Sequence, residues 1–174
     1  MWCCLGSLLL TSRTVYHHAP ADYVCPLCLL VAGGDSPSPH CAQSDLVFRT
    51  THVTAFIGAR FWPNNLAPVI VIPNRHVENI YELVPELALH VHEAARQAAL
   101  ALKQVYGCAG ITTWQHNEPA GSQSVWHYHL HVLPRYEADG LYELSQQNRY
   151  TTPEERRPYA ERLRAHFAVA LAIQ

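Results

Sequence analysis

The sequence predicts an α+β domain with a mostly antiparallel sheet of about five strands and two main helices. Short apolar segments bounded by turn residues recur along the chain, and such segments are typical of strands. Apolar residues at steps of three and four run through residues 85–106, which is the spacing of one helical face. A helix-start signal at residues 152–155 indicates a second helix near the end of the chain.

The predicted strands follow a turn-rich linker at residues 33–39, whose glycines and prolines favour tight turns. The continuous apolar run before Pro73 is typical of a central strand, and the proline ends it. The turn-prone segment 117–124 joins the last two strands. We expect strands at residues 47–49, 53–57, 69–72, 111–115 and 125–133.

The first predicted helix ends at Gly107, and the second begins at Thr152 and runs toward Ala172. Thr152 supplies the capping hydroxyl, Pro153 occupies the first helical position, and Glu155 lies three residues after the cap. The first helix carries a stripe of small residues that would permit close packing against a second copy or against the helix's own sheet: Ala94, Ala95, Ala98 and Ala101. From the first alternative we predict a homodimer.

Length and composition fit one domain. The chain has 174 residues, 49% of them apolar, and domains usually contain roughly 100 to 200 residues. Residues 1–22 are expected to form an irregular leader, and residues 23–174 a single domain. No internal repeat is visible, which argues against a solenoid.

Charge and apolar patterning exclude two classes of partner. Twelve Lys and Arg against 14 Asp and Glu give a net charge of −2, so the chain lacks the positive field that holds nucleic acid. No apolar stretch reaches the roughly 18 residues that a membrane helix needs. The six cysteines are too sparse for a disulfide framework, which favours a soluble, reduced, cytoplasmic protein.

Histidine is the unusual component. The chain has 12 histidines, as many as all its Lys and Arg together. On a strand, His127, His129 and His131 would lie on one face, because side chains alternate between the two faces. Tyr128 and Leu130 would lie on the other face, toward the core. The row could be a solvent-facing edge rich in histidine, a metal-binding row, or a catalytic site.

Cys25 and Cys28 are separated by two residues, a spacing that lets two thiolates reach one metal ion. The pair supplies only half of a tetrahedral site. His76, just after the central strand, and one of the strand histidines are candidates for the rest, although His76 alone could be an ordinary loop residue. A redox pair is the alternative, but the βαβ pattern that usually carries one is absent.

The segment 127–135, with the sequence HYHLHVLPR, resembles the signature of the histidine-triad (HIT) family, His-x-His-x-His followed by apolar residues. Residues 71–79 and 117–125 are also similar to that family, so the resemblance spans about residues 23–136. It implies a nucleotide-binding, HIT-like α+β fold.

The resemblance also implies an activity. His129 would attack the α-phosphorus of a purine nucleoside phosphate conjugate, a phosphoramidate or dinucleoside polyphosphate, forming a covalent nucleotidyl-histidine. His131 would hold the phosphate oxygens, Ser124 and Gln123 would donate hydrogen bonds, and Asn117 would fix the ribose or phosphate. The chain would thus be a nucleotide hydrolase or transferase. A zinc-stabilised nucleotide-binding module without turnover is the alternative.

A zinc-containing branch of the family is similar to this chain in a further respect. In that branch two N-terminal cysteines, a histidine after the central strand and the first triad histidine bind the metal. Carried over, the ligands are Cys25, Cys28, His76 and His127. Four protein ligands imply a structural zinc that ties the N-terminal segment to the catalytic strand.

The chain departs from the family pattern at two places. Gly58 stands where the family usually has an acidic residue for the ribose hydroxyls, which predicts loose base selectivity. The loop between Asn117 and His127 is one residue shorter than in many members, which offsets Asn117 from its usual place.

Overall fold

The computed structural model describes residues 16–34, 36 and 38–172. Most of the predicted leader therefore lies outside the described residues. From residue 16 onward the leader forms no helix or strand, and it contacts the domain through His17 and His18, which pair with Glu78 and Glu118. In the described part of the chain, no helix combines the length and the apolar character needed to cross a membrane.

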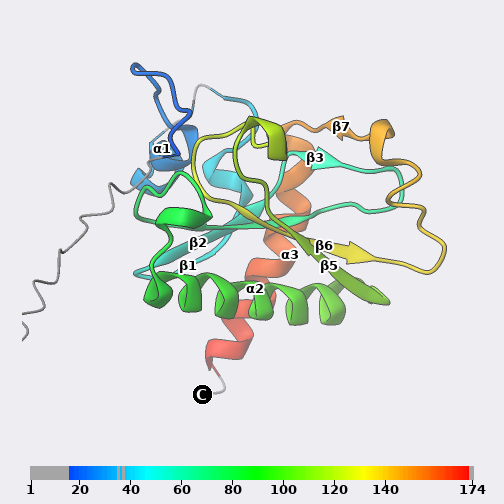
Figure 1. Cartoon of the computed structure of the whole chain (residues 1–174). Coiled ribbons are helices and arrows are strands. Elements are labelled where there is room, and N and C mark those ends of the chain that lie inside the picture. The colour runs from blue at the N-terminus through cyan, green and yellow to red at the C-terminus, as the bar shows by residue number, and fades with distance from the viewer. Residues whose placement is uncertain (1–15, 35, 37, 173–174) are drawn as a thin grey trace, which may run out of the picture.

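Five strands form one antiparallel sheet in the order β1-β2-β4-β6-β5 (Figure 1). This confirms the predicted fold class. A two-stranded sheet outside it pairs β3 with β7. The strands are β1 (Leu46–Arg49), β2 (Val53–Ile57), β3 (Arg60–Phe61), β4 (Val69–Pro73), β5 (Gly110–Trp114), β6 (Leu130–Arg135) and β7 (Arg149–Tyr150).

Both predicted helices are present. Helix α2 (Pro85–Tyr106) ends at Gly107, whose φ of 63° is easily adopted by a residue without a Cβ. Helix α3 (Pro153–Ala172) begins with a reciprocal capping box: the Thr152 amide donates to the Glu155 carboxylate (2.8 Å), and the Glu155 amide donates to the Thr152 hydroxyl (3.3 Å).

A third helix, α1 (Pro26–Ala32), was not predicted. It is too short for the apolar periodicity that reveals longer helices. Its N-cap is Cys25, whose sulfur accepts a hydrogen bond from the Cys28 amide (3.4 Å). The two-residue spacing of the cysteines is therefore the first turn of a helix.

Helices α2 and α3 cover one face of the sheet and enclose the main hydrophobic core (Figure 1). The small-residue stripe of α2 lies in this core, and each of its four alanines is at most 6% exposed. Small side chains let α2 lie close to its own sheet, so this stripe is not available to a second copy. The dimer prediction loses the observation on which it was based.

The strand predicted at residues 125–133 is shorter at its start than expected, because regular pairing begins only at Leu130. The last pair between β4 and β6 joins Val71 to Leu130, although β4 itself continues to Pro73, so the chain before Leu130 separates from β4. The Tyr128 amide instead donates to the carbonyl of Val77 (2.6 Å). The alternation of faces persists nevertheless: Tyr128, Leu130 and Val132 are buried in the main core.

Candidate active site and metal centre

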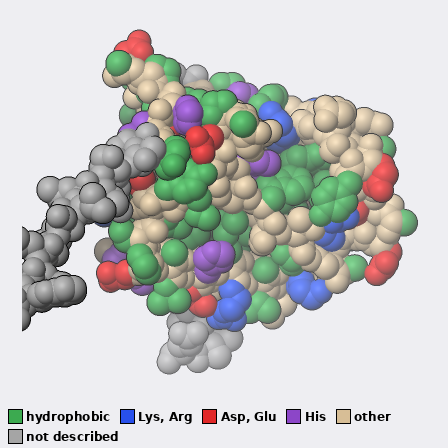
Figure 2. Space-filling view, viewed as in Figure 1, with side chains coloured by type: hydrophobic (Ala, Val, Ile, Leu, Met, Phe, Trp, Pro, Cys, Tyr) green, Lys and Arg blue, Asp and Glu red, His purple; other side chains and the backbone are tan. Residues whose placement is uncertain are grey.

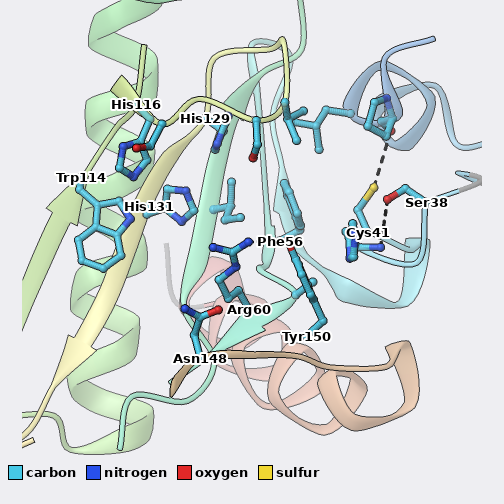
Figure 3. Close-up of a pocket in the computed structure, with 18 of the residues that line it drawn as sticks. Ser38, Cys41, Phe56, Arg60, Trp114, His116, His129, His131, Asn148 and Tyr150 are labelled. Atoms are coloured by element: carbon cyan, nitrogen blue, oxygen red, sulfur yellow. Dashed lines mark hydrogen bonds between the residues drawn. The ribbon is translucent and has the colours of Figure 1, made fainter. Parts of the chain in front are cut away.

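A cavity of about 580 Å³ lies on the face of the sheet opposite α2 and α3 (Figure 3). Its floor is a row of cross-strand neighbours, Trp114, His131, Ile70 and Phe56, contributed by β5, β6, β4 and β2. The walls come from α1, from residues 38–41, from the loop that precedes the triad and from residues 145–150. Hydrophobic and histidine side chains lie side by side on the surface seen in Figure 2.

His129 lines this cavity and is 8% exposed. Its Nδ1 lies 2.7 Å from the carbonyl oxygen of His127. Because a carbonyl only accepts, Nδ1 must carry the hydrogen, and the lone pair is then on Nε2. Burial lowers the pKa of His129 below its usual value, which keeps the ring neutral near pH 7. The site therefore holds an imidazole with one unprotonated nitrogen.

His131 lies next to it, with 5.2 Å between the two ring centroids. Burial, followed by the neighbouring His129 and His116, lowers the pKa of His131 well below its usual value. Its Nδ1 is buried and has no hydrogen-bond partner among the described residues. A neutral His131 can donate one hydrogen bond to an oxygen of a bound group.

A further histidine, His116, also lines the cavity, although the sequence did not predict it as a site residue. Its ring centroid lies 6.2 Å from that of His131, and its Nδ1 lies 2.8 Å from the carbonyl oxygen of Gly121. Asn117, the residue expected here, does not line the cavity. Its side-chain oxygen accepts from the Ile80 amide (2.8 Å). The shorter loop between Asn117 and His127 was the signal in the sequence that His116, and not Asn117, lines the cavity.

Of the two residues expected to donate to phosphate, Ser124 lines the cavity and Gln123 does not. The buried Gln123 amide donates to the carbonyls of Glu78 (2.7 Å) and Val125 (3.0 Å), and its oxygen accepts from the Glu118 amide (2.8 Å). Gln123 thus holds the loop that carries Ser124 in place.

At Gly58 a Cβ would lie 2.9 Å from Cδ1 of Ile70, which is closer than Cβ atoms approach other atoms. An acidic residue at this position therefore requires Ile70 to shift. Among the described residues, no carboxylate lines the cavity. The charge nearby is positive, because Arg60 of β3 is one of the lining residues.

The four predicted metal ligands come together beside the cavity. The ligand atoms of Cys25, Cys28, His76 and His127 all lie within 4.8 Å of one another. The Cys25 sulfur is 3.3 Å from His127 Nδ1, and the Cys28 sulfur is 3.3 Å from His76 Nδ1. Zinc bonds of about 2.3 Å to sulfur and 2.0 Å to nitrogen place such atoms roughly 3.5 Å apart in a tetrahedron. The cluster could therefore hold a metal ion.

The surroundings of His127 fit this role. Its Nε2 lies 2.9 Å from the carbonyl oxygen of Pro73, so Nε2 carries the hydrogen and the Nδ1 lone pair faces the sulfur atoms. Burial lowers the pKa of His127 to about 4. Burial also raises the pKa of the Cys28 thiol to about 12, so in the absence of a cation the thiol stays protonated. A divalent cation would reverse that preference.

The model of the HIT domain matches residues 41–138, which is more than half of the chain. The chain belongs to the HIT domain family. The protein hit of Bacillus subtilis is 35% identical over 118 residues, which cover 67% of this chain and 75% of that protein. The crystal structure of a HIT-like protein from Bartonella henselae is 30% identical, with a TM-score of 0.61 over 70% of this chain and 85% of that one.

Two more distant members extend this comparison. A zinc-bound histidine triad family protein from Mycobacterium smegmatis has the same fold, with 21% identity and a TM-score of 0.67 over 86% of this chain and 97% of that one. The asymmetrical bis(5′-nucleosyl)-tetraphosphatase of Schizosaccharomyces pombe is 26% identical over 96 residues, 55% of this chain and 52% of that enzyme. Nucleotide hydrolases thus occur among the HIT proteins similar to this chain.

Proposed function

We propose that the chain is a nucleotide hydrolase or nucleotidyl transferase that acts on purine nucleoside phosphate conjugates through a covalent intermediate on His129. The observation that carries this proposal is the hydrogen bond from His129 Nδ1 to the His127 carbonyl. It leaves a neutral, unprotonated Nε2 on a histidine that lines the cavity, and such a nitrogen is a competent nucleophile.

The reaction has two steps. In the first, the Nε2 lone pair forms a bond to the α-phosphorus, and the bond from phosphorus to the leaving group breaks with its electron pair. In the second, water or another acceptor attacks the same phosphorus, the P–N bond breaks, and His129 is regenerated. Splitting the displacement in this way replaces one difficult step by two easier ones.

Neighbouring residues have supporting roles in this proposal. His131 and Ser124 line the cavity and would donate hydrogen bonds to the phosphate oxygens as charge develops on them. The side chains of Asn117 and Gln123 bond to the backbone of Ile80 and Glu78, so they would act by holding the loop in position.

The test is the intact mass of the protein after incubation with adenosine and guanosine phosphoramidates and dinucleoside polyphosphates. We expect a nucleotidyl adduct that His129→Ala lacks, together with loss of turnover and retained binding of the monophosphate. His92→Ala, at an exposed position on α2, is the control. If His129→Ala keeps more than a few per cent of wild-type turnover, the assignment of the nucleophile is wrong. Binding without turnover in the wild type would favour the nucleotide-binding module.

We also propose that the metal is a structural zinc held by Cys25, Cys28, His76 and His127. Two sulfurs and two imidazole nitrogens form a donor set that zinc prefers, and four protein ligands complete its coordination. Bound there, zinc would supply folding energy by linking α1 to the segment before β6. The chemistry at phosphorus is left to the residues of the cavity.

A cytoplasmic homodimer completes the proposal. The four cysteines within the described residues are free thiols, as expected in a reducing compartment. With the alanine stripe buried, the dimer must use other surfaces. The outer edge of β5 has no neighbouring strand in the described sheet, and Leu89 and Leu100 of α2 are 68% and 46% exposed.

A further inference from the structure

The cavity contains one permanent positive charge and no negative charge among the described residues that line it. Arg60 is the only lysine or arginine in this lining, and the other basic groups are four histidines. Burial lowers the pKa of His40 and His131, which keeps these two rings neutral near pH 7. The chain thus places one permanent cation in a cavity that no carboxylate of the described residues lines.

Arg60 is held in position by β7. It pairs with Tyr150 across the two-stranded sheet, its guanidinium donates a hydrogen bond to the Tyr150 hydroxyl, and its central carbon lies 4.8 Å from the centre of the Tyr150 ring. His40 stacks on the same ring, with 4.1 Å between centroids. In Figure 3 Arg60 extends into the cavity toward His131. Asn148 also lines the cavity, and its side-chain amide donates to the carbonyl of Ser145 (2.6 Å).

The guanidinium lacks an anionic partner in this structure. No carboxylate oxygen of the described residues lies within 4.0 Å of it, and its one side-chain partner among them is the neutral Tyr150 hydroxyl. A guanidinium has five N–H donors in a planar fork that matches phosphate. Several of these donors are therefore free to bind an anionic group that enters the cavity.

We propose that Arg60, supported by Tyr150 and Asn148, forms a second anion subsite, and that the preferred ligand is a nucleotide with two phosphate groups. One phosphate lies at His129 and His131, as in the proposed function on which this inference rests. The other lies at Arg60. Asn148 and Tyr150 lie after residue 138, where the matched HIT domain ends, so part of the subsite comes from residues beyond that match.

The second phosphate could lie on the phosphate chain or on the ribose. The test is calorimetric titration of the full chain at constant salt with AMP, ADP and adenosine 3′,5′-bisphosphate. We expect ADP or the bisphosphate to bind at least about tenfold more tightly than AMP, because a charge-assisted fork is among the strong hydrogen-bond arrangements. Tighter binding of ADP than of AMP would place the second phosphate on the phosphate chain, and tighter binding of the bisphosphate would place it on the ribose.

Variants separate this subsite from a structural role of Arg60 in the β3–β7 pair. Arg60→Gln should reduce the advantage of the second phosphate to within about twofold while AMP affinity stays within about threefold, and Arg60→Lys should recover part of it. Arg157→Gln, an equal loss of charge at an exposed position outside the cavity, should leave all affinities unchanged.

Two results would overturn the subsite: equal affinities of the wild type for all three ligands, or an equal loss for all three in Arg60→Gln. If AMP binds and His129-dependent turnover occurs, only the subsite has failed. If the wild type binds none of the three nucleotides, the proposed function fails with it.

Discussion

At the scale of single residues, four histidines near one another have different environments and therefore different uses. His127 is fully buried with its Nδ1 facing two sulfur atoms, whereas His129 has its Nδ1 bonded to a carbonyl and lines the cavity. His131 and His116 line the cavity beside it. In the proposed function the same side chain would thus serve as a metal ligand, a nucleophile or a phosphate contact, depending on which ring nitrogen bonds to the backbone.

His116 offers a prediction at this scale. We expect His116→Ala to lower kcat/KM by roughly tenfold or more, because a cavity-lining imidazole near His131 can contact phosphate or leaving group. Asn117→Ala should lower the melting temperature, because it removes the hydrogen bond to the Ile80 amide, and should affect kcat/KM less. Steady-state kinetics and thermal unfolding of both variants provide the measurement. A larger loss of kcat/KM in Asn117→Ala than in His116→Ala would show that Asn117, and not His116, contacts the substrate.

At the scale of elements, α1 has too few residues to be stable alone, and its position depends on what lies beneath it. Leu27 and Leu30 pack with Phe56 and Ile72 in a second hydrophobic cluster, separate from the main core. The cysteine at its N-cap and the one a turn later face His76 and His127. A metal ion at this point would fasten the helix that forms one wall of the cavity.

The zinc proposal predicts one zinc per chain, measurable by elemental analysis of protein purified without chelator. Cys28→Ala should remove the metal and lower the melting temperature, because zinc binding adds its free energy to folding. Cys41→Ala is the matched control, since Cys41 is a buried cysteine of the same hydrophobic cluster but is not among the four grouped ligands. Unchanged zinc in Cys28→Ala would show that the ligand set is wrong.

The exposed edge of β5 and the outer face of α2 give the dimer a testable form. We expect a dimer mass in sedimentation at micromolar concentration. Leu100→Glu should shift it toward the monomer if the outer face of α2 is part of the interface, because an unpaired buried carboxylate is costly. Gln104→Glu, also at an exposed position on α2, adds the same charge without removing an apolar side chain and is the control. If the wild type sediments as a monomer at every concentration tested, the prediction of a dimer is wrong.

At the scale of the whole molecule, the buried histidines make stability depend on pH. The pKa of His127 is about 4 in the folded chain, against about 6.5 in an unfolded one, and burial also lowers those of His129 and His131. The unfolded state therefore binds more protons below pH 6.5. The stability that the neutral, buried rings contribute is complete above pH 6.5 and is lost as the pH falls toward 4.

We therefore expect the free energy of unfolding of chelator-treated protein to fall between pH 7.5 and pH 5. His127 alone accounts for about 3 kcal/mol over its full window. Urea unfolding at several pH values measures the slope, and His127→Asn should make it shallower. A slope of zero across this range would contradict the neutral, buried state of these rings.

Several elements can be predicted from the sequence because their signals are local. The ends of α2, the capping box of α3 and the alternation around the triad each depend on residues a few positions apart, so periodicity and capping chemistry suffice to predict them. The motif around His127 also indicated the family, and the matched HIT domain confirms it.

Which side chains line the cavity depends on the tertiary structure. The triad strand separates from β4 before Leu130, His116 rather than Asn117 lines the cavity, and Arg60 contacts Tyr150, which lies 90 residues away along the chain. These outcomes depend on contacts between segments distant in the chain, and neither spacing nor composition carries information about which side chains such contacts bring together.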